Sequence, residues 1–196
     1  MKQLIISVGR EFGSGGHEIA QKLSELYNIP LYDRNLLKEI ASEKNLDHST
    51  LEEYDEKRKR FVIYRKVRGM DASPEVAVAH LQFNYLKDKA AAGESFVVVG
   101  RCAETMLKDN ENLIPIFVLG DEEAKIERVM KLYNKTREEA IELMNYKDRA
   151  RKDYHNHFCP IKWGDSRNYE LSINSSKLGV AESVKIIAEY INARIF

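Results

Sequence analysis

The residues best suited to chemistry lie near the start of the chain, in the stretch GREFGSGGHEIAQKL at positions 9–23. Its closely spaced glycines can adopt the positive φ angles that turn backbone N–H groups inward around an anion. A helix that begins near Gly16 would add the partial positive charge of its N-terminus at the same place. The pattern is typical of a phosphate-binding loop, and its candidate contacts are Gly9, Gly13, Ser14, Gly15, Gly16 and His17.

This loop departs from the common phosphate-loop pattern G-x-x-x-x-G-K-[ST], in which the lysine reaches the outer phosphates and the hydroxyl holds magnesium. When GSGG is aligned on the end of that pattern, Gly16 takes the place of the lysine and His17 the place of the hydroxyl. Arg10 then stands at the first glycine, and Gly9 is one residue too far upstream. We expect Arg10 to supply the missing charge and Ser14 to approach a metal or a phosphate, although guanidinium and ammonium are not equivalent at phosphate.

A simpler interpretation is that the glycines only form a tight turn between a strand and a helix. The apolar strand before the loop, the helix after it and the cation Arg10 inside it favour anion binding instead. These features do not by themselves indicate phosphoryl transfer.

Strand and helix patterns alternate along the chain. Short apolar runs predict strands at 4–8, 29–33, 95–100, 113–120 and 169–174. Periodic apolar stripes and capping residues predict helices from 16, 35–44, 74–92, 121–133, 136–158 and 180–191. The alternation implies an α/β fold with a mostly parallel sheet and helices on both faces.

Ligands of such sheets bind at the carboxyl ends of the strands. The glycine loop follows the first predicted strand, Asp33 follows the second and Arg101 follows the third. Because three separate segments deliver polar groups to one rim, we expect the binding site there.

Composition excludes several classes of protein. The 196 residues carry 31 Lys+Arg and 31 Asp+Glu, so nothing global indicates binding to nucleic acid. No stretch approaches the roughly 20 apolar residues that span a membrane, and two cysteines suit a reducing cytoplasm. The basic run 57–68 would either steer a polyanion or form the solvated face of a helix.

Four stretches together resemble the cytidylate kinase-like family, relatives of the nucleoside monophosphate kinases: ISVGREFGSGGHEIAQKL, YDRNLLKEIA, VVVGRCAETML and DRARKDYHNHFCPIKWGDSRNYELSIN. The resemblance implies a P-loop NTPase-type three-layer fold as a single domain, 1–196, with a helical lid. It places an acceptor-side insertion at 47–70 and the lid at 134–168. It also implies ATP and Mg²⁺ as cofactors and phosphoryl transfer to a small phosphorylated acceptor such as CMP.

The resemblance assigns roles to several cations. Arg101 matches the arginine that holds the acceptor phosphate, a task that suits bidentate guanidinium pairing. Asp33 and Arg34 lie where the acceptor-binding segment begins, and Asp33 would equally cap a helix. In the lid, Arg149, Arg151 and Lys152 would assist Arg10 at the transferring phosphoryl group. Arg149 and Lys152 share a helix face, whereas Arg151 points more to one side.

The chain also departs from true cytidylate kinases, which keep the loop lysine and follow the Gly-Arg pair with aspartate. Here these positions hold Gly16 and Cys102. Three hypotheses therefore stay open: a nucleotide kinase, a nucleotide-binding regulator or pseudokinase without turnover, and a kinase of another small metabolite.

Two weaker patterns remain. HNHFC places His155, His157 and Cys159 at alternate positions, which allows a metal site, although alternation along a helix scatters the side chains. The helix predicted at 74–92 would offer a surface for a homodimer, while a role in the core explains its apolar face as well.

Overall fold

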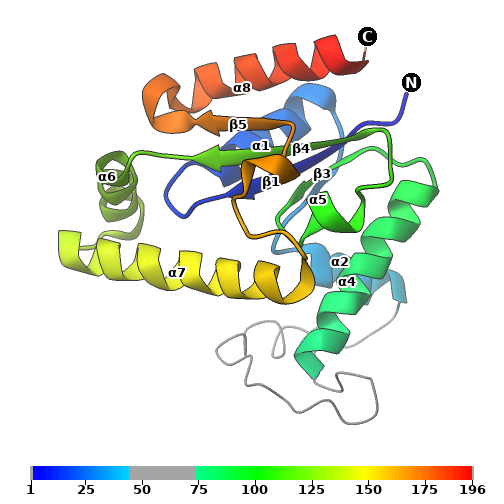
Figure 1. Cartoon of the computed structure of the whole chain (residues 1–196), viewed down its shortest axis with the longest axis horizontal. Coiled ribbons are helices and arrows are strands. Elements are labelled where there is room, and N and C mark those ends of the chain that lie inside the picture. Colours follow the sequence, from blue (N-terminus) through cyan, green and yellow to red (C-terminus); the bar gives the residue numbers. More distant parts are fainter. Residues whose placement is uncertain (1, 45–73, 196) are drawn as a thin grey trace.

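The computed structural model describes residues 2–44 and 74–195, so the predicted insertion 47–70 and the basic run 57–68 lie outside the described residues. The described chain builds a five-stranded parallel sheet in the order β2-β3-β1-β4-β5 (Figure 1). The strands are β1 (Ile5–Arg10), β2 (Leu31–Tyr32), β3 (Phe96–Val99), β4 (Leu113–Leu119) and β5 (Leu171–Asn174). The predicted α/β class with a parallel sheet is confirmed.

Helices cover both faces of the sheet, because strand side chains alternate between the faces and both sets are apolar. Ile6 and Val8 of β1 pack with α1 (Gly16–Tyr27) and α8 (Ser175–Ile195). On the other face, Ile5 packs with α2 (Leu36–Lys44), α4 (Pro74–Ala91) and α5 (Ala103–Met106). Val78, Tyr85 and Leu86 of α4 lie in this second core, so much of the helix considered for a homodimer is internal.

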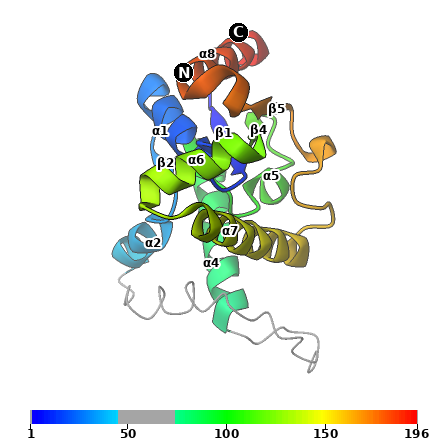
Figure 2. The same cartoon turned by 90° about the vertical axis from the view of Figure 1, so that its left-hand side faces the viewer.

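Two further helices, α6 (Glu122–Tyr133) and α7 (Arg137–Phe158), pack against each other beside the end of β4 (Figure 2). The capping box predicted at the start of α7 is present, because Thr136 accepts from the Glu139 amide and Glu139 accepts from the Thr136 amide. After α7 the chain returns to β5 through a short 3₁₀ turn, η1 (Ser166–Asn168). No helix of the described residues is both long and apolar enough to cross a membrane.

Pro115 lies inside β4, opposite Ser7 of β1, whereas the sequence placed it at the start of the strand or at an edge. The carbonyl of Pro115 accepts from the Glu170 amide at 2.8 Å, so this residue points towards β5. Pairing with β5 begins only at Ile116, opposite Leu171. The missing N–H of the proline therefore falls where the β4–β5 ladder has not yet started.

Gly9 belongs to β1 rather than to the loop, and it is fully paired with Phe117 in the β1–β4 register. A Cβ at this position would lie 2.8 Å from Phe117 Cδ2 and 3.1 Å from the Tyr169 ring. Glycine at this position leaves room for the rings of Phe117 and Tyr169. The sequence alone had instead suggested a phosphate contact for Gly9.

We expect Gly9→Ala to lower the free energy of unfolding by about 1–3 kcal/mol, because it overpacks a buried site. Urea denaturation measures the change. In a Phe117→Ala background the added methyl meets less resistance, so the same substitution should cost distinctly less. Equal costs in both backgrounds would contradict the steric explanation.

Candidate functional site

The loop between β1 and α1 leaves several backbone amides unused. The amides of Glu11, Ser14 and Gly16 donate to partners nearby, to the Val118 and Glu11 carbonyls and to the Ser14 hydroxyl. Among the hydrogen bonds of the described residues, none uses the amides of Gly13, Gly15 or His17. Gly13 and Gly15 have φ angles of 85° and 77°, and Gly15 caps α1. The N-terminus of α1 therefore presents free donors to an anion.

The Ser14 side chain serves the loop itself. It is 3% exposed, and its hydroxyl donates to the Glu11 carbonyl at 2.9 Å. The Ser14 carbonyl accepts from the Ser175 hydroxyl at the start of α8, at 2.5 Å. In this conformation the Ser14 hydroxyl stabilises the turn. The sequence alone had suggested that it would approach a metal or a phosphate instead.

The Arg10 side chain occupies the space that two glycines leave open. A Cβ on Gly16 would lie 2.5 Å from Arg10 Cβ, and a Cβ on Gly100 would collide with Arg10 Nη1. Arg10 therefore crosses from the start of α1, where the common loop carries lysine, to the end of β3. This placement fits the expected substitution of one cation for another.

Phe12 fixes the outer side of the loop. Its ring packs against Ile126 and Val129 of α6 and against Met144 of α7, and it stacks on Tyr133 with centroids 5.5 Å apart. The loop is thus anchored through an apolar side chain between two helices that follow β4.

Two polar contacts join α7 to the same loop. The Phe12 amide donates to Asp148 at 2.7 Å, and Arg151 Nη1 donates to the Arg10 carbonyl at 3.2 Å. The Arg151 guanidinium also lies over the Phe12 ring, 5.3 Å from its centroid. Burial, partly offset by the Phe12 amide, raises the pKa of Asp148.

The three predicted lid cations therefore separate. Arg151, expected to point sideways, is the one that contacts the loop, whereas Arg149 and Lys152 are exposed on α7. Helical spacing can be read from the sequence, but it does not tell which side of α7 packs against the loop.

Sequence reasoning missed two cations of α6. Lys125 pairs with Glu11 at 2.8 Å, and Arg128 pairs with Glu18. A Cβ on Gly15 would lie 3.3 Å from the Arg128 Cζ, so this guanidinium lies against the loop. The position of α6 in the sequence could have identified both cations. A helix that follows a parallel strand begins at the carboxyl end of the sheet, so its first turns lie beside the other loops at that end.

After β2, the carboxylate of Asp33 makes two hydrogen bonds, one within its own segment and one to the start of α1. Asp33 Oδ1 accepts from the Asn35 amide at 2.9 Å, as a capping residue does, and Oδ2 bonds to His17 Nε2 at 2.7 Å. Burial opposes ionisation, but these two hydrogen bonds outweigh it and lower the pKa of Asp33. Arg34 is exposed. Both sequence interpretations of Asp33, the cap and the site residue, are thus compatible with its position.

The end of β3 turns sharply at Arg101. Gly100, Arg101 and Cys102 have consecutive φ angles of 74°, 59° and 54°. Left-handed geometry costs an ordinary residue about 1–2 kcal/mol, and such strain gathers at functional sites. Arg101 is only 8% exposed and follows Gly100, whose amide donates to Val8 of β1. Arg101 therefore lies at the same rim as the glycine loop.

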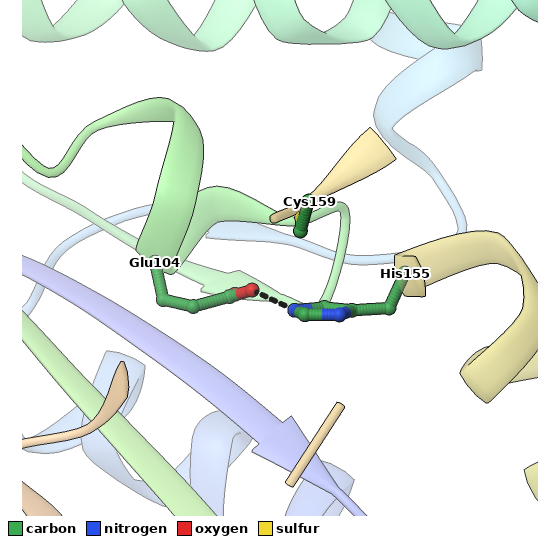
Figure 3. A group of neighbouring side chains, drawn as sticks. All are labelled: Glu104, His155 and Cys159. Carbon is green, nitrogen blue, oxygen red and sulfur yellow. Dashed lines mark hydrogen bonds and ion pairs between the residues drawn. The ribbon is translucent and has the colours of Figure 1, made fainter. Parts of the chain in front are cut away.

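A second polar cluster lies beneath the turn that follows Arg101. His155 Nε2 and Glu104 Oε1 are 2.7 Å apart, and Cys159 lies beside both (Figure 3). Burial lowers the pKa of His155, but Cys159 and Glu104 outweigh it and raise that pKa to about 10. The neighbouring Cys102 lowers the pKa of Cys159, while Cys159 and burial raise the pKa of Cys102.

Solved structures similar to this one include kinases of the P-loop fold. Shikimate kinase from Bacteroides thetaiotaomicron has a TM-score of 0.58 at 15% identity and covers 96% of this chain and 98% of its own. Shikimate kinase from Acinetobacter baumannii, solved with shikimate, has a TM-score of 0.52 at 14% identity, with coverage of 99% and 96%. At these identities the likeness shows that the chain has the α/β fold of these kinases.

The family follows from sequence. Residues 5–177 match the model of the cytidylate kinase-like family, and the chain belongs to that family. An uncharacterized protein from Eubacterium ventriosum is 40% identical, with a TM-score of 0.78, and the match covers 97% of this chain and 99% of that one. No curated protein matches the sequence.

The His17–Asp33 contact makes a prediction about pH. Because the pKa of Asp33 lies below its usual 3.8, ionised Asp33 stabilises the fold above that pH, and the contribution is lost as pH falls through the lowered pKa. His17→Ala should raise the pKa of Asp33, as followed by NMR titration of its carboxyl carbon. His80→Ala, at an exposed histidine of α4, should leave it unchanged. An unaltered Asp33 titration in His17→Ala would refute the coupling.

Proposed function

We propose that the chain is an ATP-dependent phosphotransferase that passes the terminal phosphoryl group to a small phosphorylated acceptor such as CMP. The observation that supports this most is the set of unused amides of Gly13, Gly15 and His17 at the N-terminus of α1, with Arg10 beside them. Membership of the cytidylate kinase-like family supports the same class of reaction.

On the donor side, the loop amides would bind phosphate oxygens and the N-terminus of α1 would favour their charge. Arg10, which lies between the start of α1 and the end of β3, would neutralise phosphate charge, and so would Arg128 of α6. These groups are positioned before the ligand arrives, which is how electrostatic stabilisation of phosphoryl transfer works.

Bound ATP would supply the phosphoryl group, with Mg²⁺ to neutralise its charge. The carboxylates near the loop are already paired: Glu11 with Lys125, Glu18 with Arg128 and Asp33 with His17. Ser14 is turned inward. The described residues therefore fit Mg²⁺ held mainly through phosphates and water, as is common for this ion, and not a dedicated protein cage.

On the acceptor side, Arg101 would pair with the acceptor phosphate, and Asp33 with Arg34 would contact the rest of the molecule. The segment 134–168 would act as the lid. Arg151 would then hold α7 to the loop, and the exposed Arg149 and Lys152 would remain for contacts with substrate.

We expect Arg10→Ala to weaken ATP binding by tenfold or more, because hydrogen bonds to charged groups contribute about 1.5–3 kcal/mol. Isothermal titration and transfer from labelled ATP to CMP measure the loss. Arg194→Ala, which removes an arginine from the far end of α8, is the matched control. Unchanged affinity in Arg10→Ala would exclude Arg10 as the substitute for lysine.

The converse variant moves the cation to its usual place. Gly16→Lys alone should disrupt the loop, because its Cβ meets Arg10 Cβ at 2.5 Å. Arg10→Gly combined with Gly16→Lys removes that contact and should restore part of the ATP binding. If ATP stabilises the natural chain but no acceptor is phosphorylated, the protein is a nucleotide-binding regulator and the transferase proposal fails.

One observation favours a second acceptor class. Asp33 places a carboxylate beside the N-terminus of α1, where it could accept a proton from a hydroxyl acceptor. A phosphate acceptor is already ionised and needs no such base. Under our proposal Asp33→Asn should raise KM for the acceptor and lower kcat by less than about tenfold. A fall in kcat of about 10²–10⁴, with a hydroxyl compound as the preferred acceptor, would instead identify a small-metabolite kinase.

A further inference from the structure

Three side chains with metal-binding atoms converge away from the glycine loop, on the inner side of the turn that follows β3. One oxygen of Glu104, one ring nitrogen of His155 and the Sγ of Cys159 all lie within 4.8 Å of one another (Figure 3). Glu104 is 4% exposed, His155 4% and Cys159 7%. No step of the proposed phosphoryl transfer uses these groups.

The local structure explains why two of the three come from α7. His155 lies in the last turn of the helix and Cys159 is its C-cap, and the Cys159 amide donates to the His155 carbonyl at 2.8 Å. Residues four apart lie on one side of a helix. The sequence pattern had drawn attention to alternate positions, but His157 is exposed and the third donor, Glu104, comes from α5.

The imidazole of His155 retains one unused nitrogen. Its Nε2 is bound to Glu104, whereas its buried Nδ1 has no hydrogen-bond partner among the described residues. A metal ion shared with Glu104 would bind Nε2 in place of the hydrogen between the two groups, and Nδ1 would then carry the ring proton. Cys102 packs in the same cluster as Cys159 but is not one of the three converging donors.

We propose that Glu104, His155 and Cys159 bind one divalent transition-metal ion of the Zn²⁺ type. Carboxylate, imidazole and thiolate are the ligands that Zn²⁺ takes in proteins, and its bond lengths place donor atoms about 3.3–3.8 Å apart in a tetrahedral site. The described donors are within about 1 Å of that spacing. A thiolate ligand selects Zn²⁺ over Mg²⁺, which separates this site from the nucleotide's metal.

A divalent cation at these donors would take the place of the proton that the raised pKa leaves on His155 and would balance the Glu104 carboxylate and the Cys159 thiolate. The bound metal would join the last turn of α7 to α5, directly after Arg101 and Cys102. It would therefore hold one end of the proposed lid against the segment that carries Arg101.

Titration of the reduced, untagged chain with Co²⁺ tests the site, because Co²⁺ reports its ligands by absorption. We expect one equivalent to give a thiolate-to-cobalt charge-transfer band and the visible bands of tetrahedral Co²⁺, both removed by Zn²⁺ but not by excess Mg²⁺. Cys159→Ser should abolish the charge-transfer band, and His155→Gln should weaken binding by at least tenfold. His157→Gln, two residues away and exposed, is the matched control and should bind normally.

Native mass spectrometry of the wild-type chain keeps the test independent of whether a variant folds. We expect one Zn²⁺ per chain. A chelator should remove this ion and thereby lower the melting temperature of the protein. Absence of both the metal and the charge-transfer band in the wild-type chain would overturn the proposal, and so would a band that persists in Cys159→Ser. Neither result depends on ATP, so it leaves the proposed transferase activity untouched.

Discussion

The conformation of the glycine loop between β1 and α1 depends on Phe12, whose side chain is held by helices outside the loop. Gly13 and Gly15 have positive φ angles here, but glycine also permits many other conformations and loses entropy when it is fixed. Burial of the Phe12 ring between α6 and α7, with its amide on Asp148, selects one of them. Helices that follow β4 thus determine the shape of a loop that precedes α1.

Close packing explains why the loop lacks the usual lysine. A Cβ at Gly16 or at Gly100 would clash with the Arg10 side chain. Arg10 in this conformation therefore requires glycine at both positions. Parallel pairing of β1 with β3 brings these residues together, since the register fixes where each strand ends. The Cβ of Arg10 lies against the start of α1, and its guanidinium lies at the end of β3.

Helix α7 is attached at two places of different chemistry. Near its middle, Asp148 and Arg151 bind the backbone of the loop. At its end, His155 and Cys159 meet Glu104 in a buried polar cluster. Buried polar groups hold a structure well only when each is satisfied, and here Glu104 Oε1 and His155 Nε2 bond to each other at 2.7 Å.

Local patterns determined much of this protein without coordinates. Apolar runs located the strands, the Thr136–Glu139 spacing located the start of α7, and the closely spaced glycines marked the turn between β1 and α1. Periodicity and capping act over a few residues, so a single sequence carries them. Tertiary structure alone decided that Arg151 rather than Arg149 contacts the loop, that Arg128 lies against Gly15, and that Glu104 joins His155 and Cys159. All three contacts join residues from distant segments. They depend on which side of each helix is packed, and tertiary packing settles this whereas sequence spacing does not.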